Sequence, residues 1–337
     1  MREGKPSFTA EGAAAIRGAE SMRPEGRRVC YDPFAKEFVG KKFQILGRSR
    51  LLVWLMVRFT ELVVPGMVGY VVGRTKYIDD YLSSRIDDGI EQLVIMGAGY
   101  DSRAYRFETL KERVKVFEVD FPSTQKVKMD KVKKALGSLP DHVVYVAVDF
   151  NSQKLSERLF ECGYDRNLKT LFIWEGVTAY ITPEALDDTL SFVAKNSGEG
   201  SSIIFDFFIK GAVDGTTGIG AVNRIRRLYE LVGQPLTSER VTLGLEQGAI
   251  EAFMQERGFY QVKNVTGGSF TSSYLKGTNQ NARMLCIVCA TVAPRARRFR
   301  TLVIACDERP FAHSWNEAVL RWQRTGSLPT SQSPAHS

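Results

Sequence analysis

The segment from Gln92 to Arg103 constrains the fold of this chain most strongly. It reads QLVIMGAGYDSR, an apolar run that ends in a Gly-x-Gly turn, and the run Val116-Phe117-Glu118-Val119-Asp120 follows after a short helical span. An apolar strand, a glycine turn and an acidic strand end roughly 20 residues later are typical of the first crevice of a doubly wound α/β sheet, which binds a nucleoside ligand. We therefore expect the functional site at this crevice.

Strands and helices alternate through the rest of this region. Short runs rich in Val, Ile and Phe, separated by polar helical stretches, are typical of a parallel sheet that is covered on both faces. The sequence predicts a Rossmann-like, doubly wound, mostly parallel sheet of seven strands, at residues 93–96, 114–119, 143–148, 171–174, 202–207, 260–265 and 283–291.

Three regions are expected along the chain: a helical cap or lid over residues 1–90, a Rossmann-like domain over 91–293, and a basic, partly disordered tail over 294–337. In the cap, helical spacing of apolar residues predicts a helix over 74–85 with Arg74 at its start. Residues 51–72 are apolar enough to suggest a membrane helix, but Arg58 and Glu61 interrupt them and Pro65-Gly66 breaks them. Two shorter amphipathic helices are expected instead, which either cover a pocket or pack into the core.

Composition narrows the classes of function. The net charge is +8, but the tail from Pro294 holds seven arginines against three acids and so supplies half of it. The remainder is mildly basic, which suits an anionic small molecule better than a nucleic acid. Cys286 and Cys289 lie in a strand-like run and are expected to be buried thiols rather than metal ligands, so no metal site is predicted. Without an apolar secretory core after Met1, we expect a cytoplasmic protein with no stable membrane insertion; the oligomeric state is left open.

Three acids follow successive predicted strands: Asp120, Asp149 and Glu175. Ligands of open parallel sheets bind outside the carboxyl ends of the strands, so these acids should converge on one crevice. The third glycine of a dinucleotide motif is replaced by Ser102, which argues against a pyrophosphate ligand. Carboxylates suit a ligand with ribose hydroxyls, an adenine amino group and an ammonium, as in S-adenosylmethionine.

Four ordered motifs resemble a known family. They are RTKYID at residues 74–79, GAGYDSR at 97–103, FEVDFP at 117–122 and WEGVTAYI at 174–181. They are similar to motifs of the leucine carboxyl methyltransferase-like family of class I S-adenosylmethionine-dependent methyltransferases, which includes many bacterial and mycobacterial small-molecule O-methyltransferases. The resemblance extends over residues 7–293 and implies S-adenosylmethionine as the cofactor.

The resemblance implies a role for each matched position. Arg74 would pair with the carboxylate of the cofactor's methionine part, and Gly97 and Gly99 would let the backbone pass close to it. Asp120 would bind the ribose, Asp149 and Phe150 would lie at the adenine, and Glu175 would lie beside the ammonium. Arg17 is a further candidate near the carboxylate. Structural alternatives stay open: a helix N-cap for Asp149, an N-cap or turn for Asp120, a surface acid for Glu175 and a solvated side chain for Arg74.

The expected chemistry needs few groups. Methyl transfer from a sulfonium requires that the protein position two reactants and exclude water. A hydroxyl acceptor usually wants a general base, yet the chain has only His142, His313 and His336. A carboxylate is already ionised at neutral pH, so O-methylation of a carboxylate or an acidic hydroxyl on a small, anionic or apolar acid is favoured. Tyr180 is the candidate that orients the acceptor, and Asp206 is either a base or a strand-end hydrogen-bond partner.

Other functions remain possible on the same fold. They are methylation of a protein C-terminal carboxyl group, a non-catalytic binding protein, and a nicotinamide-dependent oxidoreductase. Protein methylation would require a surface groove for a chain terminus, whereas the apolar helices of 51–72 suggest a closed pocket for a small acceptor. The oxidoreductase is disfavoured by the missing third glycine.

Overall fold

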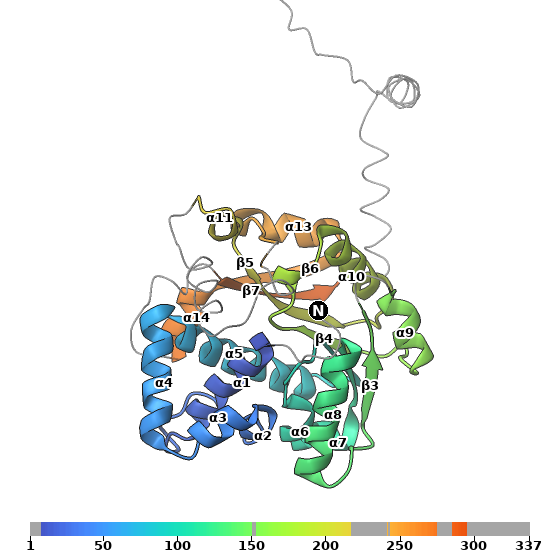
Figure 1. Ribbon diagram of the computed structural model, residues 1–337. Coiled ribbons are helices and arrows are strands. Elements are labelled where there is room, and N and C mark those ends of the chain that lie inside the picture. Colours follow the sequence, from blue (N-terminus) through green and yellow to red (C-terminus); the bar gives the residue numbers. More distant parts are fainter. Residues whose placement is uncertain (1–7, 150–152, 217–240, 242, 275–284, 295–337) are drawn as a thin grey trace, which may run out of the picture. The chain divides into compact units, whose positions relative to one another are not determined.

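The computed structural model describes residues 8–149, 153–216, 241, 243–274 and 285–294 (Figure 1). Residues 1–293 form one compact unit. Its centre is a seven-stranded sheet, made of β1 (Gln92–Met96), β2 (Lys115–Asp120), β3 (Val143–Ala147), β4 (Thr170–Trp174), β5 (Ser202–Phe208), β6 (Phe259–Thr266) and β7 (Leu285–Val292).

The strand order is β3-β2-β1-β4-β5-β7-β6. The first five strands are parallel, and β7 runs antiparallel to both β5 and β6. The chain switches direction across the sheet between β1 and β4, which is where ligands bind in folds of this type. The predicted Rossmann-like, mostly parallel sheet is therefore confirmed.

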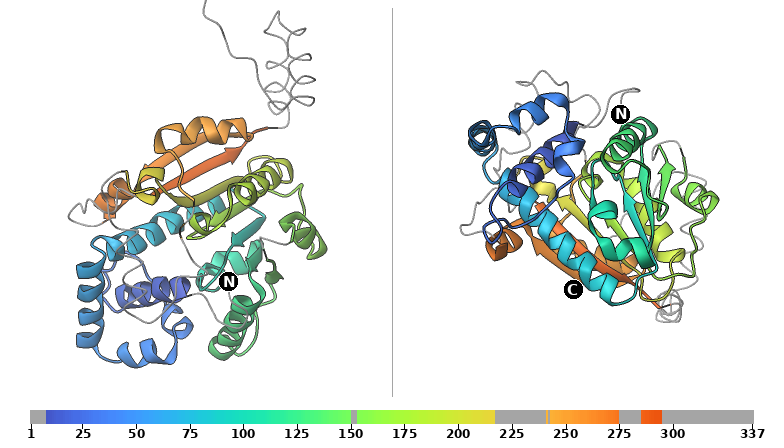
Figure 2. Two further views of the ribbon diagram at one scale, coloured as in Figure 1. Left: turned by 45° about the horizontal axis from the view of Figure 1, so that its top comes forward. Right: turned by 90° about the horizontal axis from the view of Figure 1, so that it is seen from below.

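Helices cover both faces of the sheet (Figures 1 and 2). On one face lie α5 (Met67–Asp87), α6 (Arg103–Arg106), α7 (Glu108–Arg113) and α8 (Pro122–Leu136). On the other lie α9 (Leu155–Glu161), α10 (Pro183–Lys195) and α13 (Ile250–Glu256). Four short elements complete the connections: η1 (Thr178–Tyr180), α11 (Lys210–Val213), η2 (Gln247–Ala249) and α14 (Gly267–Tyr274).

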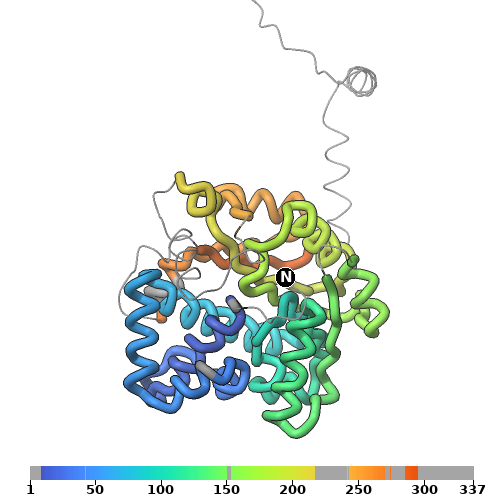
Figure 3. The backbone as a smooth tube through the Cα atoms, in the orientation of Figure 1, coloured from blue at the N-terminus to red at the C-terminus, as the bar shows by residue number. Residues whose placement is uncertain are grey.

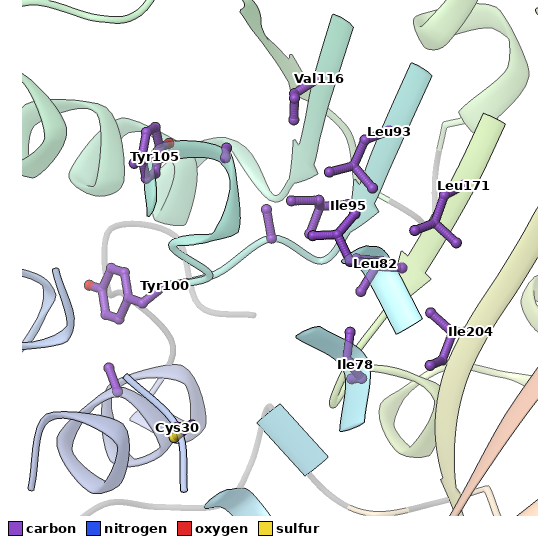
Figure 4. Close-up of a cluster of buried hydrophobic side chains, with 14 of the residues drawn as sticks. Cys30, Ile78, Leu82, Leu93, Ile95, Tyr100, Tyr105, Val116, Leu171 and Ile204 are labelled. Atoms are coloured by element: carbon purple, nitrogen blue, oxygen red, sulfur yellow. The ribbon is translucent and has the colours of Figure 1, made fainter. Parts of the chain in front are cut away.

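Strand alternation explains why the sheet has two cores. Leu93 and Ile95 point to the face with α5, where Ile78 and Leu82 pack against them (Figure 4). Val94 and Met96 point to the opposite face. Every residue of β1 is buried, as expected for a central parallel strand with helices on both sides.

The helices before β1 are α1 (Phe8–Ser21), α2 (Ala35–Phe38), α3 (Lys41–Leu46), α4 (Arg50–Val63) and α5. Their path is clearest in the tube of Figure 3, where α1 to α4 gather beside one end of the sheet. Helices α4 and α5 are bent by 104° at the break that contains Pro65 and Gly66. Gly66 has a φ of 87°, a left-handed conformation that glycine adopts without strain. The predicted break at Pro65-Gly66 and the first shorter helix are confirmed, but the second continues to Asp87 as part of α5; α5 packs into the core whereas α4 has no buried residue.

One predicted boundary is wrong. The helix expected over 74–85 begins at Met67, so Arg74 lies in its third turn and not at its start. Gly69 and Gly73 lower the intrinsic helix propensity of this first part. Tyr70, Val71 and Val72 are nevertheless buried, and their packing outweighs the propensity.

Among the described residues, no single helix is long and apolar enough to cross a membrane. The bent pair of α4 and α5 passes that test together, by length and composition only.

We expect Leu82→Ala to lower the free energy of unfolding by about 2–5 kcal/mol, because a fully buried side chain between α5 and the sheet would leave a cavity. Leu62→Ala is the matched control, since Leu62 is 79% exposed and its loss should change stability by about 0.5 kcal/mol or less. Urea unfolding of both variants measures the difference. Equal losses would contradict the assigned core.

Candidate active site

A cavity of about 460 Å³ opens at the carboxyl ends of the parallel strands. Its floor is formed by the ends of β1, β2, β4 and β5, and helices α1, α4 and α5 contribute its walls. The described lining divides by chemistry. We call its charged residues the polar half: Arg17, Arg74, Asp101, Asp120, Asp149, Glu175 and Asp206. Its large apolar residues, which come mostly from α3, α4 and the start of α5, are called the apolar half: Phe43, Met56, Phe59, Val64, Met67 and Phe207.

The glycine turn after β1 brings the backbone to the cavity. Gly97 has a φ of 65°, and a Cβ atom there would lie 2.2 Å from Cγ2 of Val177. Gly99 has a φ of 42°, and its added Cβ would lie 3.1 Å from Cβ of Ala10 in α1. Both backbone conformation and close packing therefore require glycine at Gly97, and the conformation favours it at Gly99.

Asp120 ends β2 with its carboxylate directed at neighbouring backbone groups. The N–H of Phe121 donates to Oδ1 at 2.7 Å, and the N–H of Gly99 donates to Oδ2. Burial raises the pKa of Asp120 to about 6, although these two N–H groups oppose that shift. Phe121, not Asp120, is the N-cap of α8. Asp120 is thus a buried carboxylate in the cavity wall. Its hydrogen bond with Gly99 links the end of β2 to the turn after β1.

Glu175 follows β4 and is held between two arginines. Nη2 of Arg74 lies 2.9 Å from Oε1, and Nη1 of Arg103 lies 2.7 Å from Oε2. Burial alone would raise the pKa of Glu175, but the Arg74 and Arg103 guanidinium groups outweigh it and lower the pKa to about 2. Glu175 is therefore an ionised and mostly enclosed group, with 12% of its side chain exposed, rather than a surface acid.

Asp206 in β5 bonds the same arginine. Its Oδ2 accepts hydrogen bonds from the hydroxyl of Tyr70 at 2.6 Å and from Nη1 of Arg74 at 2.5 Å. Its Oδ1 accepts from the backbone N–H of Gly176 at 2.6 Å. Of the two roles considered for Asp206, the structure shows that of a hydrogen-bond partner: it fixes Arg74 and the turn after β4.

Arg103 is a central residue of this network to which the sequence reasoning assigned no role. Besides Glu175, its guanidinium bonds Asp79 of α5, at 2.8 Å, and Asp101 of the glycine turn. The sequence did contain a signal for this role. Arg103 follows the glycine turn and Asp101 closely, and a long side chain at that position can reach the strand ends. Only the fold, however, brings Asp79 from residues further back in the chain to the same guanidinium.

The structure brings most of the predicted site residues together. Arg74, Gly97, Gly99, Asp120, Asp149, Glu175 and Tyr180 all line the cavity, while Phe150 lies outside the described residues. Helix α9 begins at Leu155 with Lys154 as its N-cap, so Asp149 does not cap that helix. Arg17 also lines the cavity, with its guanidinium bonded to Asp32 at 2.8 Å and to the carbonyl of Tyr100 at 2.6 Å.

Arg74 departs from a simple solvated arginine in one further respect. Its Nη atoms are occupied by Glu175 and Asp206, whereas its Nε is buried without a hydrogen-bond partner. An unpaired buried donor is costly, so the Nε of Arg74 is a polar group that the described residues leave unsatisfied beside the cavity.

The comparison with known families agrees with this geometry. A family model described as leucine carboxyl methyltransferase matches residues 10–194, which is more than half of the chain. The chain belongs to the leucine carboxyl methyltransferase family. The matched range contains most of α1, the glycine turn, Asp120 and Glu175, so it covers the polar part of the cavity except Asp206.

Relatives within this family carry a shared provisional name, S-adenosyl-L-methionine-dependent methyltransferase. One from Mycobacterium marinum is 30% identical over 278 residues, 77% of this chain and 84% of the relative. One from Streptomyces coelicolor is 30% identical over 62% of this chain and 74% of the relative. A Bacillus subtilis relative is 33% identical over 172 residues, and that match spans 50% of this chain and only 55% of the relative's length.

A solved structure shares the fold. A crystal structure from Thermobifida fusca, provisionally described as a methyltransferase, superposes with a TM-score of 0.51 at 12% identity, and the match covers 87% of this chain and 97% of that one. This chain therefore has a methyltransferase fold, and its cavity lies at the carboxyl ends of the parallel strands.

We expect Glu175→Gln to lower the free energy of unfolding at neutral pH by on the order of 3 kcal/mol, because Arg74 and Arg103 would lose their shared counterion. The folded-state pKa of about 2 lies below the ordinary value of 4.5, so this contribution is present above about pH 4.5 and is lost as the pH falls toward 2. The deficit of the variant should therefore shrink in acid, as measured by denaturant unfolding at several pH values.

Glu108→Gln is the control for that measurement, because Glu108 is exposed and its ion pair among the described residues is with Lys111 of the same helix. Its loss should cost about 1 kcal/mol or less. A Glu175→Gln deficit no larger than that of Glu108→Gln would show that the buried pairs do not stabilise the fold.

Proposed function

We propose that this protein transfers a methyl group from S-adenosylmethionine to a carboxylate or acidic hydroxyl of a small molecule. The observation that carries the proposal is the division of the cavity. A polar half with fixed charges adjoins an apolar half, and among its described lining residues none is a histidine or a cysteine.

The polar half fits the cofactor. Arg74 lines this half and carries the positive charge that the carboxylate of the methionine part requires, and Asp120 can accept hydrogen bonds from ribose hydroxyls. Asp149 lies in the same wall, at the next strand end, where the adenine amino group would be reached. Family membership and the names of the relatives support the same ligand.

The charge of the polar half also suits this ligand. Among the described residues, the buried network contains four arginines and five carboxylates, a net charge of minus one: Arg17, Arg74, Arg103, Arg106, Asp32, Asp79, Asp101, Glu175 and Asp206. S-adenosylmethionine combines a zwitterionic amino acid part with a sulfonium, and its net charge is plus one. Asp120 and Asp149 of the same wall add two more carboxylates, so acids outnumber arginines around this half, which suits a ligand with a net positive charge.

The reaction asks little of the protein beyond placement. When bound, S-adenosylmethionine would supply an electrophilic methyl group: the acceptor oxygen bonds to the methyl carbon in line with the C–S bond, which breaks and releases S-adenosylhomocysteine as a neutral thioether. Arg74, Glu175 and Asp120 fix the donor, and their own buried partners keep them from moving. The apolar wall excludes water, so the acceptor oxygen meets the methyl group and not a competing nucleophile.

The acceptor half favours an acid over a neutral alcohol. A neutral hydroxyl would require a general base, and the described lining offers no histidine for that role. A carboxylate is ionised at neutral pH and needs no proton transfer. Tyr180 lines the cavity and is proposed to orient the acceptor through its hydroxyl, which makes it a positioning residue.

Methylation of a protein C-terminal carboxyl group is the second candidate, favoured by the description of the family model. The apolar side chains of Phe43, Met56 and Phe59 favour a compact apolar acid instead. A non-catalytic binding protein with the same cavity would bind the cofactor and transfer nothing.

The test is transfer of a labelled methyl group to a panel of small carboxylic acids, phenols, aliphatic alcohols and C-terminal peptides. We expect methyl esters of apolar carboxylic acids, and Tyr180→Phe should lower kcat/KM by about tenfold while cofactor affinity is retained. Leu136→Ala, far along α8 and exposed, is the control and should match the wild type. Transfer only to peptides would select the second candidate, and transfer to nothing despite cofactor binding would select the third.

A further inference from the structure

Helix α4 presents an apolar face to solvent. None of its residues is buried, and its large exposed apolar residues have exposed fractions of 39% to 79%: Leu51, Leu52, Trp54, Leu55, Phe59 and Leu62. Residues 51, 55, 59 and 62 recur at helical spacing, so they form one stripe. Figures 1 and 2 show α4 at the outer edge of the cap helices, away from the sheet. Apolar stripes of this size on a protein surface mark an interaction site.

The charges around this stripe are positive. Arg48, Arg50 and Arg58 are all exposed, and the guanidinium of Arg58 lies 5.9 Å from the ring centroid of Trp54. The acid of α4, Glu61, is turned toward α5, where its carboxylate accepts hydrogen bonds from the N–H groups of Gly66 and Val68 at 2.8 and 2.9 Å. The exposed face of α4 therefore combines leucines and a tryptophan with arginines.

We propose that α4 docks on an anionic lipid surface and lies in the plane of the interface. Leucine, phenylalanine and tryptophan on one side with arginines beside them are the features of helices that bury an apolar face at the boundary of headgroups and acyl chains. Trp54 suits this boundary because its ring is apolar and its N–H is polar. The arginines would pair with lipid phosphates.

A second copy of the chain fits this face less well. A twofold contact places the same patch on both subunits, so two such stripes would bring their Arg58 side chains close together. The described residues of the stripe supply no acid to pair with them, because Glu61 is held by the start of α5. An anionic surface would supply negative charges for the arginines, whereas a second copy would place like charges next to each other.

Docking would also explain the position of α4 at the cavity. Met56 and Phe59 line the apolar half, and Phe59 is itself half exposed. The lipid surface would then lie beside the half that takes the acceptor, and an apolar acid dissolved in the bilayer could enter there. This last step rests on the proposed function, whereas docking itself does not.

The experiment is sedimentation of the full chain with vesicles of phosphatidylcholine alone and with vesicles that also contain phosphatidylglycerol. We expect binding to the anionic vesicles that weakens as salt is raised, and roughly fivefold weaker binding for Arg58→Gln. The double variant Leu55→Glu/Leu62→Glu should reduce binding by at least about tenfold. Neither leucine lines the cavity.

Leu136→Glu is the matched control, because Leu136 is 43% exposed but lies on α8. Leu136→Glu leaves α4 unchanged, so it should bind vesicles like the wild type. The basic tail is present in every variant and cannot cause a difference between them. Thermal unfolding checks that all variants fold. Equal vesicle binding by Leu55→Glu/Leu62→Glu and by the wild type would overturn the proposal, since another surface would then carry the affinity. So would a wild-type dimer that does not bind vesicles and that becomes a monomer in the double variant.

Each failure is distinguishable from failure of the proposed function. Vesicle binding needs neither cofactor nor acceptor, and methyl transfer to a water-soluble acid needs no vesicle. Loss of vesicle binding with methyl transfer retained would contradict only the docking proposal. Loss of methyl transfer with vesicle binding retained would contradict only the proposed function.

Discussion

The site depends on the mostly enclosed carboxylate of Glu175, shared by Arg74 and Arg103. An ionised carboxylate away from water is tolerated only with close partners, and each arginine in turn needs a carboxylate. This requirement links three segments that are distant in sequence: helix α5, the glycine turn with α6, and the end of β4. Asp79 and Asp206 complete the balance from α5 and β5. The polar half of the cavity is therefore held in place before any ligand enters.

The two halves of the cavity are built differently, and this matches what each has to do. The polar half rests on strand ends and paired charges, which suits recognition of one invariant ligand. The apolar half rests partly on α4, which has no buried residue and turns its other side to solvent. A wall of this kind can vary in sequence without loss of the sheet, so the proposed acceptor choice and surface association can change while the proposed donor site is preserved.

The sheet and the polar strand ends were predictable because their signals are local. Apolar runs such as Leu93 to Met96 and the acids that follow strands are visible in the sequence, and the parallel arrangement then brings the acids together. The start of α5 was missed, because Gly69 and Gly73 lower local helix propensity while tertiary packing of Tyr70 and its neighbours overrides it. The role of Arg103 was missed for a related reason. Its partner Asp79 approaches only when α5 packs on the sheet, and no spacing in the sequence encodes that contact.

The most direct test of the central claim is calorimetric titration of the protein with S-adenosylmethionine and, separately, with NAD, across a pH series. The account predicts saturable binding of S-adenosylmethionine alone. In the proposed function a ribose hydroxyl donates to the ionised carboxylate of Asp120, whose pKa is about 6, so affinity should fall by up to about tenfold per pH unit below that value. Asp120→Asn should bind more weakly and lose this pH dependence while remaining folded. Binding of NAD instead, or affinity unchanged in Asp120→Asn, would contradict the account.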